Sequence, residues 1–495
     1  MTKAPPPILA LDQGTTSSRA VLFAADGTPL AQSQQEFPQL FPAPGEVEHD
    51  PEAIWASQLT TAKAALEHDA TPAALGVTNQ RETLVLWEKD TGKPVGNAVV
   101  WQSRVSGPVC DRLKNEGLEP LIREKTGLLL DPYFTGTKLT HRFEATPGLR
   151  AACERGEVLA GTIDSFLIWR LTGGRRHVTD AGNASRTLLF DIHAGEWDDE
   201  LLRVFGVPRA CLPDVVDSAG VLGETDPAVL GVRLPIAGVA GDQQAATFGQ
   251  GCHVAGSAKN TYGTGCFLLM NTGGTPVPSS NRLLTTVGWR IAGRTTYCLE
   301  GAVLVAGAAV QWLRDGLGLF EDAAEVEALA GTVPDTGGVT FVPAFVGLGA
   351  PYWRPDARGT IAGITRGTTR GHIARAALEA IAHRTRDVVG AMNADAAAAG
   401  LPALADLRAD GGASRNDLLM QTQADLLGVP VRRAARPETT AWGAAKLAAV
   451  GAGVWPDDNT ATLTDRTFTP AIGRDEADAR QARWTAAVRG CLPAE

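Results

Sequence analysis

Residues 12–19, which read Asp-Gln-Gly-Thr-Thr-Ser-Ser-Arg, have the residue types that phosphate binding requires. They stand between two apolar runs, residues 8–11 and 20–23, and this pattern predicts a strand, a tight turn and a second strand. Gly14 lets the backbone approach a ligand closely, and the Thr and Ser hydroxyls can donate to phosphate oxygens. Arg19 adds a planar cation. A polar hairpin without a ligand is the alternative, but so many suitable residues in one turn favour phosphate binding.

Three further polar segments follow apolar runs and could contribute to a site. Residues 79–83, Asn-Gln-Arg-Glu-Thr, can donate to and accept from hydroxyls, although an exposed turn with a self-neutralising ion pair fits equally well. Asp242 could take a proton from a hydroxyl that Gln243 orients, although capping a helix is the commoner use of such an aspartate. The glycines of residues 410–416 leave room for a base or ribose, although a plain turn is commoner.

The second half of the chain holds a segment that is weakly similar to the first motif. Residues 260–265, Asn-Thr-Tyr-Gly-Thr-Gly, lead into the apolar run 266–270. Two such turns half a chain apart suggest two related domains that face one nucleotide. We expect the boundary near residue 250, which gives an N-terminal domain 1–250 and a C-terminal domain 251–495.

The elements around these segments alternate between strand-like and helix-like runs, which indicates α/β layers. The spacing of apolar residues predicts helices over 52–68, 302–313, 372–392 and 418–427. Trp101 and Tyr133 each follow an apolar run and could line a small-molecule pocket, although aromatic residues in such places more often belong to the core.

Composition excludes several classes of protein. A chain of 495 residues with 44% hydrophobic content is long enough for two or three cores. No run of about 18 apolar residues predicts a membrane span, and Met1-Thr2-Lys3 with the prolines that follow lacks a signal-peptide core. The seven cysteines are scattered without zinc-ligand spacing, which suggests reduced thiols and a cytoplasmic location. The net charge of −10 disfavours nucleic acid and anionic membranes as partners.

Together these segments resemble the glycerol kinases of the carbohydrate kinase family, which share the actin/Hsp70-type ATPase fold. The resemblance extends from residue 8 to about residue 455. Its motifs are residues 11–19, 79–83, 131–134, 161–164, 183–187, 241–244, 262–267, 311–315, 347–353 and 410–413. Segment 79–83 separates glycerol kinases from xylulose and gluconate kinases, which are only loosely similar.

The resemblance implies an α/β fold of two ribonuclease H-like domains with the active site in the cleft between them. It also implies ATP-dependent phosphorylation of glycerol to sn-glycerol 3-phosphate, with release of ADP, by a homodimer or homotetramer. Glycerol would be held by Arg81, Glu82, Tyr133, Asp242 and Gln243, with Trp101 and Phe267 as apolar walls. ATP phosphates would meet Thr15, Thr16, Ser17, Arg19 and Thr264. The adenosine would be bordered by Gly307, Gln311, Gly412 and Asn416. Asp12 would position Mg²⁺ through water, and Asp242 would be the general base.

Three alternatives stay open from the sequence. A kinase for another polyol or ketose would use the same fold. An actin-like ATPase that assembles or binds clients would hydrolyse ATP without an acceptor. A two-domain sugar-binding protein would normally carry an export signal.

Overall fold

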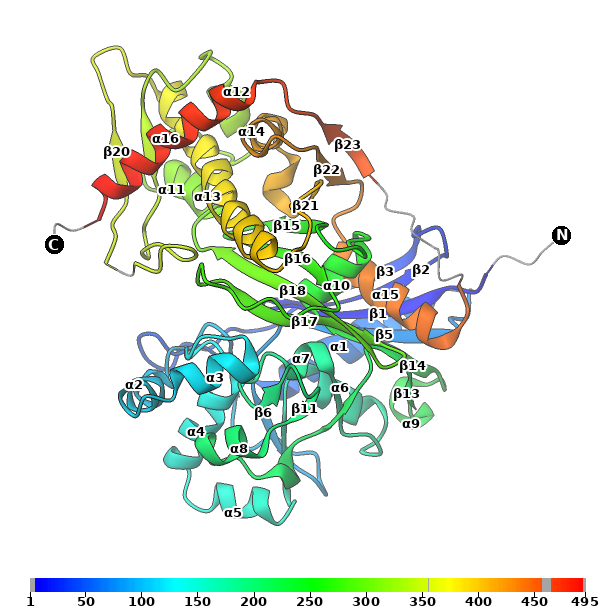
Figure 1. Cartoon of the computed structure of the whole chain (residues 1–495). Helices are drawn as coiled ribbons and strands as arrows, with labels where there is room; N and C mark the ends of the chain where they lie inside the picture. The colour runs from blue at the N-terminus through cyan, green and yellow to red at the C-terminus, as the bar shows by residue number, and fades with distance from the viewer. Residues whose placement is uncertain (1–4, 355, 456–463, 493–495) are drawn as a thin grey trace.

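One sheet of 13 strands runs through both halves of the chain (Figure 1). The computed structural model describes residues 5–354, 356–455 and 464–492, so Met1-Thr2-Lys3 lies outside the described residues. The five strands of the first half are β1 (Ile8–Gln13), β2 (Ser17–Phe23), β3 (Pro29–Glu36), β5 (Ala74–Asn79) and β14 (Pro235–Gly241). Their counterparts in the second half are β15 (Ala258–Tyr262), β16 (Cys266–Gly273), β18 (Arg294–Val303), β21 (Leu407–Asp410) and β22 (Val431–Ala434). The other strands of this sheet are β13 (Ala219–Glu224), β17 (Leu284–Ile291) and β23 (Thr464–Phe468).

The two halves repeat one strand pattern. In the first half, β1 pairs antiparallel with β2 and parallel with β5, and β5 is parallel with β14. In the second half, β15 pairs antiparallel with β16 and parallel with β21, and β21 is parallel with β22. The predicted pair of ribonuclease H-like domains is therefore confirmed, as are the two hairpins that begin them.

Helices cover the faces of this sheet. The principal ones are α1 (Pro51–Leu66), α10 (Asp242–Gly249), α11 (Gly307–Asp315), α13 (Arg370–Ala398), α14 (Asp417–Leu427), α15 (Thr439–Ala452) and α16 (Arg474–Gly490). The first half also carries α2 (Gly107–Asn115), α3 (Glu119–Thr126), α4 (Thr135–Ala145), α5 (Leu149–Glu154), α6 (Ile163–Leu171), α7 (Ala181–Ala184), α8 (Asp199–Phe205) and α9 (Pro227–Leu230), and the second half α12 (Glu325–Ala330). Short strands pair beside the main sheet: β4 (Glu48–His49), β6 (Val85–Glu88), β7 (Ala98–Val99), β8 (Val158–Gly161), β9 (Val178–Asp180), β10 (Phe190–Asp191), β11 (Glu196–Trp197), β12 (Asp214–Val216), β19 (Thr340–Val342) and β20 (Thr360–Ala362).

Three of the four predicted helices are confirmed as α1, α13 and α14. The prediction over 302–313 is wrong at its start, because Ala302 and Val303 still belong to β18 and pair with Phe267 and Cys266 of β16. Helix α11 begins only at Gly307. An apolar run fits a buried strand and a buried helix equally well, so periodicity alone could not locate this change.

Segments of the second half pack directly against the first half. Helix α15 lies against β1, β5 and β14, and it crosses α10 closely (Figure 1). Val287 of β17 and Tyr297 of β18 belong to the same apolar core as α2, α4 and α8. The two halves are therefore packed against each other in two places, one at α15 and one at β17 and β18.

The described residues contain no helix that is long and apolar enough to cross a membrane. Within the same residues, no cluster of His, Cys, Asp and Glu has the arrangement of a metal site. All seven cysteines are buried and free.

Candidate functional site

The loop that follows β5 holds two charged side chains inside the protein. Arg81 is 3% exposed and Glu82 is 1% exposed, so the alternative of an exposed turn is wrong. Glu82 has a φ of 59°, which is uncommon for a residue other than glycine. Its carbonyl oxygen accepts from Thr135 Oγ1 and from Lys138 Nζ, each at 3.1 Å. These bonds from α4 hold the loop in the conformation that turns Arg81 toward Glu300 of the second half and Glu82 toward Arg186.

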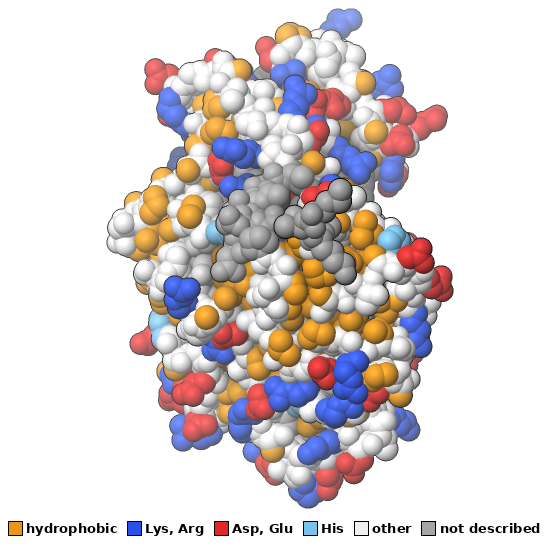
Figure 2. All heavy atoms as spheres, turned by 90° about the vertical axis from the view of Figure 1, so that its right-hand side faces the viewer, with side chains coloured by type: hydrophobic (Ala, Val, Ile, Leu, Met, Phe, Trp, Pro, Cys, Tyr) orange, Lys and Arg blue, Asp and Glu red, His pale blue; other side chains and the backbone are white. Residues whose placement is uncertain are grey.

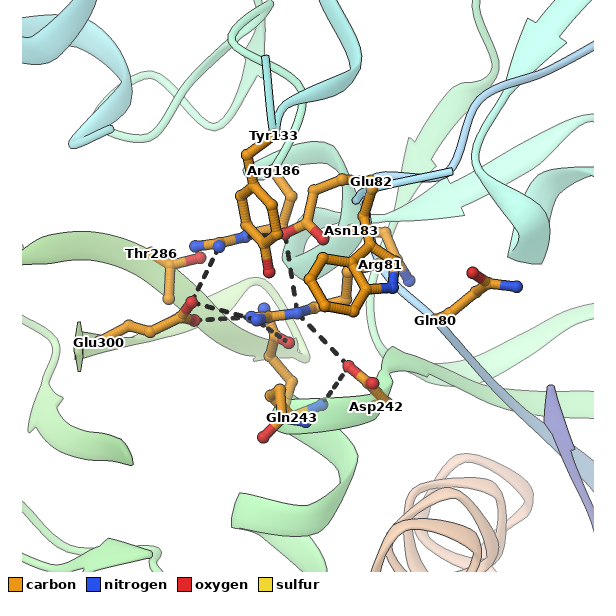
Figure 3. A network of polar contacts seen from close by, with 12 residues as sticks. Gln80, Arg81, Glu82, Tyr133, Asn183, Arg186, Asp242, Gln243, Thr286 and Glu300 are labelled. Carbon is orange, nitrogen blue, oxygen red and sulfur yellow. Dashed lines mark hydrogen bonds and ion pairs between the residues drawn. The ribbon is translucent and has the colours of Figure 1, made fainter. Parts of the chain in front are cut away.

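Glu300 of β18 lies between two arginines and links the halves (Figure 3). Its carboxylate accepts from Arg81 Nη1 at 2.6 Å and from Arg81 Nη2 at 3.1 Å. Arg186 donates to Glu300 at 2.9 Å and to Glu82 at 2.6 Å. The four charges therefore alternate in sign, which fixes the orientation of each side chain.

The network sets the protonation of both carboxylates. Burial by itself would raise the pKa of Glu300, but the guanidinium groups of Arg186 and Arg81 outweigh it and lower this pKa from 4.5 to about 2. Burial raises the pKa of Glu82, although Arg81 and Arg186 oppose that shift. Glu300 is thus the fixed negative charge of the site.

We expect Glu300→Gln to lower both stability and the affinity for a ligand of Arg81. Removing one partner from a buried ion pair costs about 3–5 kcal/mol, because the remaining charge is left uncompensated. The folded pKa of about 2 lies below 4.5, so ionised Glu300 stabilises the fold above pH 4.5 and loses this effect as pH falls toward 2. The difference in free energy of unfolding between wild type and variant, measured from pH 7 to pH 3, should therefore shrink below pH 4.5.

Glu224→Gln is the matched control, since Glu224 forms an exposed ion pair with Arg233 at 2.9 Å. Such surface pairs contribute about 0–1 kcal/mol, so this variant should unfold like the wild type. Equal stability of Glu300→Gln and wild type at neutral pH would contradict the structural role of Glu300.

Asp242 is the first residue of α10 and follows β14 directly, with Gly241 as the N-cap. Its Oδ1 lies 3.4 Å from Arg81 Nε and accepts from the Gln243 backbone N–H at 2.7 Å. The Asp242 side chain is 31% exposed, whereas Arg81 and Glu300 are enclosed. Among these charged groups, this carboxylate is therefore the one that an incoming molecule can reach.

Gln243 is held by a buried lysine. Lys259 of β15 donates to Gln243 Oε1, and it also donates to Thr261 Oγ1 at 3.0 Å. Burial lowers the pKa of Lys259. The amide of Gln243 is thereby oriented with its oxygen toward Lys259 and its NH₂ group available as a donor.

Three aromatic rings stand beside the charged network. Trp101 contacts Tyr133 edge-to-face with centroids 5.6 Å apart, and it contacts Phe267 of the second half at 6.4 Å. Trp101 Nε1 donates to Thr15 Oγ1 at 3.1 Å. Arg186 lies over the Tyr133 ring at 5.8 Å. The apolar walls are thus connected both to the ion network and to the turn between β1 and β2.

That turn contains Thr15 and Thr16, with Ser17 at the start of β2. Asp12 and Arg19 are opposite each other on the two strands. Burial raises the pKa of Asp12 to about 6, and the nearby carboxylates of Asp242 and Glu438 add to the shift against the opposing effect of Arg19. A carboxylate that is crowded by other carboxylates is a favourable ligand for a cation.

The second hairpin turn meets the start of α11 and the end of β21. The carbonyl oxygen of Thr264 accepts from the N–H groups of Ala306 and Ala308, and Gly307 N–H donates to Gly263. Gly411, which precedes Gly412, approaches so closely that an added Cβ would lie 2.5 Å from the Tyr262 carbonyl oxygen. Gly307 and Gly412 are therefore both brought close to the backbone of residues 262–264, which contains Thr264.

The structure places the two remaining predicted nucleotide residues on helices. Asn416 is the N-cap of α14 and accepts from Leu419 N–H at 2.8 Å. Gln311 lies on α11 with an exposed side chain.

Sequence reasoning assigned no role to three residues of this site: Arg186, Lys259 and Glu300. Arg186 lies in segment 183–187, which had been noticed only as a motif. Glu300 is a charged residue inside the apolar run 297–303 of β18, and that is a signal of a buried functional group, whereas Lys259 stands among the polar residues of β15 and carried no such signal.

Comparison with known proteins identifies the family of this chain. Residues 7–249 match the FGGY family of carbohydrate kinases, N-terminal domain, and residues 258–452 match the C-terminal domain of the same family. The chain is 58% identical over 97% of both chains to a protein of Alkalilimnicola ehrlichii named "Glycerol kinase". It is 54% identical to "Glycerol kinase 2" of Thermotoga maritima over 98% of both chains.

A solved structure gives the same result. The crystal structure of Plasmodium falciparum glycerol kinase with ADP has a TM-score of 0.94 to this chain, with 32% identity over 99% of both chains. The chain therefore belongs to the FGGY family of carbohydrate kinases, within its glycerol kinase group.

Proposed function

We propose that this chain catalyses the ATP-dependent phosphorylation of glycerol to sn-glycerol 3-phosphate, with release of ADP. The observation that carries this proposal is the polar network of Arg81, Glu82 and Asp242, with Trp101 and Phe267 beside it. Glycerol is almost entirely hydroxyl groups and CH₂ groups, so its site must pair donors with acceptors next to apolar faces. Such a site rejects analogues that lack a hydroxyl by up to ~10⁴–10⁵-fold.

In the proposed reaction Asp242 accepts the proton of the attacking hydroxyl. Its position supports this role, because it is the partly exposed carboxylate between Arg81 and Gln243. Arg81 and Glu82 hold the hydroxyls of glycerol, and Tyr133 and Gln243 complete their hydrogen bonding. No covalent intermediate on the protein is needed, since phosphoryl transfer depends on positioning and charge neutralisation.

The phosphates of ATP are proposed to lie against Thr15, Thr16, Ser17, Arg19 and Thr264. Arg19 Nε has no hydrogen-bond partner among the described residues, which suits a group that receives an anion. Gly307, Gln311, Gly412 and Asn416 are proposed to border the adenosine. Mg²⁺ would supply charge neutralisation at the phosphates, and Asp12 is proposed to hold it through water.

The proposal also covers the domain boundary, the cellular location, the oligomeric state and the partners of this chain. We place the domain boundary near residue 250, between the two family matches. A cytoplasmic location is supported by seven buried, free cysteines, which suit a reducing compartment. A homodimer or homotetramer, and the absence of nucleic acid and membrane partners, stay predictions from the sequence.

The direct test is ADP release from Mg-ATP with and without glycerol, with sn-glycerol 3-phosphate followed in the same sample. We expect stoichiometric formation of ADP and product, and only in the presence of glycerol. A panel of polyols and ketoses in the same assay separates glycerol from rival acceptors. ADP formed equally without any acceptor would instead support an actin-like ATPase and overturn the proposed function.

A further inference from the structure

One lysine is completely enclosed next to the residues proposed for glycerol. On the face drawn in Figure 2, Lys and Arg side chains stand at the surface among Asp and Glu. Lys138 differs from them, because it is fully buried and lies in the first turn of α4. Burial opposes its positive charge, and the positive end of the helix dipole opposes it as well. The groups that hold this ammonium group in place are therefore the evidence for its role.

The partners of Lys138 are two backbone carbonyl groups. Its Nζ donates to the carbonyl oxygen of Tyr133 at 2.5 Å and to that of Glu82 at 3.1 Å. Glu82 lies in the loop after β5 and Tyr133 in the loop before α4, so one ammonium group joins two separate segments. Both residues belong to the proposed glycerol site, and Figure 3 shows their side chains close together beside Arg186.

These contacts fix backbone that no helix or strand holds. Neither Glu82 nor Tyr133 lies in a regular element. The φ of Glu82 is 59°, and a residue other than glycine keeps such a conformation only where its surroundings determine it. Thr135 Oγ1 also donates to the Glu82 carbonyl oxygen, but Lys138 bonds to both loops. The relative position of the two glycerol-binding side chains therefore depends on Lys138.

The proton of this lysine is weakly held. Burial lowers the pKa of Lys138 from 10.5 to about 7. Glu82, Asp131 and Cys110 oppose this shift. Arg104, in the loop before α2, adds to it. The ammonium group and the neutral amine are therefore both populated near neutral pH.

We propose that Lys138 is a positioning residue whose ammonium form holds Glu82 and Tyr133 in place for glycerol, and that its neutral form weakens glycerol binding. This inference rests on the proposed function, because it concerns the same site. Hydrogen bonds from a charged donor are roughly twice as strong as those from a neutral one. Glycerol therefore binds the ammonium form more tightly, and by linkage its binding draws a proton onto Lys138.

The stability of the fold depends on this proton in the opposite sense. Between pH of about 7 and 10.5 the unfolded chain keeps the proton on Lys138, whereas the folded chain loses it. The contribution of Lys138 to the free energy of unfolding therefore rises with pH across this range, while the glycerol affinity falls. A lysine with a purely structural role would produce only the first effect.

The test is calorimetric titration of the full chain with glycerol, without nucleotide, in buffers of different ionisation enthalpy. Near neutral pH we expect net proton uptake on binding, and a dissociation constant that rises severalfold as the pH is raised to about 9. Lys138→Met should raise the dissociation constant roughly tenfold, as expected when a hydrogen bond from a charged donor is lost, and should abolish the proton uptake. Lys63→Met is the matched control, because Lys63 is exposed on α1, and it should bind glycerol like the wild type.

Lys138→Gln replaces Lys138→Met if that variant does not fold, because its amide can still donate but cannot titrate. Proton uptake should be absent in this variant too. Proton uptake that persists in a Lys138 variant, or glycerol binding by the wild type without any uptake, would overturn the inference and leave the proposed function standing. Failure of the wild type to bind glycerol at all would overturn both.

Discussion

Asp242→Asn is expected to lower turnover by ~10²–10⁴-fold, the usual contribution of a positioned general base. Asparagine has nearly the same shape, and its oxygen can still accept from the Gln243 N–H, which Asp242 Oδ1 accepts at 2.7 Å. It cannot accept a proton from a hydroxyl at neutral pH. The loss should therefore fall on kcat, while the glycerol dissociation constant changes only severalfold. Steady-state kinetics and calorimetric glycerol titration separate the two effects.

Asp214→Asn is the matched control for this change. Asp214 has a 77% exposed side chain and only a 3.6 Å ion pair with Arg209. The same chemical change at this exposed position should leave kcat unaltered. Wild-type turnover in Asp242→Asn would remove Asp242 from its proposed role, whereas loss of glycerol binding with normal kcat would make it a binding residue only.

Helices α10 and α15 cross closely at Gly443. Among the glycines at this crossing, Gly443→Ala should cause the largest loss of stability. A Cβ at Gly443 in α15 would lie 1.8 Å from the carbonyl oxygen of Ala245 in α10, and backbone atoms there cannot move aside cheaply. Overpacking typically costs about 1–3 kcal/mol, and a contact this short with backbone puts Gly443→Ala at the upper end of that range. Thermal unfolding should show an apparent Tm lower by on the order of 5–10 °C. Activity should also fall, because α10 begins with Asp242.

Gly390→Ala provides the comparison within a helix of the same chain. A Cβ at Gly390 in α13 would meet nothing within 4 Å. Alanine is more favourable than glycine in a helix by ~0.8–1 kcal/mol, so this variant should be as stable as the wild type or slightly more stable. If Gly443→Ala also matched the wild type, the close crossing of α10 and α15 would not be needed for the fold.

Local chemistry made much of the site predictable. The two hairpins, with their Gly-Thr turns, are strand-forming runs on both sides of residues that favour turns, and both were placed correctly. The helix over 302–313 was misplaced at its start, since β18 continues through Val303 and only its pairing with β16 decides this.

The charged network was only partly predictable. Arg81 and Glu82 stand together in the sequence, but their burial depends on Thr135 and Lys138 of α4. Glu300, the partner of Arg81, is 219 residues from it along the chain. No local pattern encodes a contact over such a separation.

The sequence by itself determined the strand-turn-strand motifs, the two-domain α/β class and the types of group that the site contains, because these depend on neighbouring residues. Only the tertiary structure decided that Glu300 and Arg186 complete the ion network and that α15 returns to pack on the first half. These features arise from burial and from contacts between distant segments, and both are properties of the folded chain as a whole.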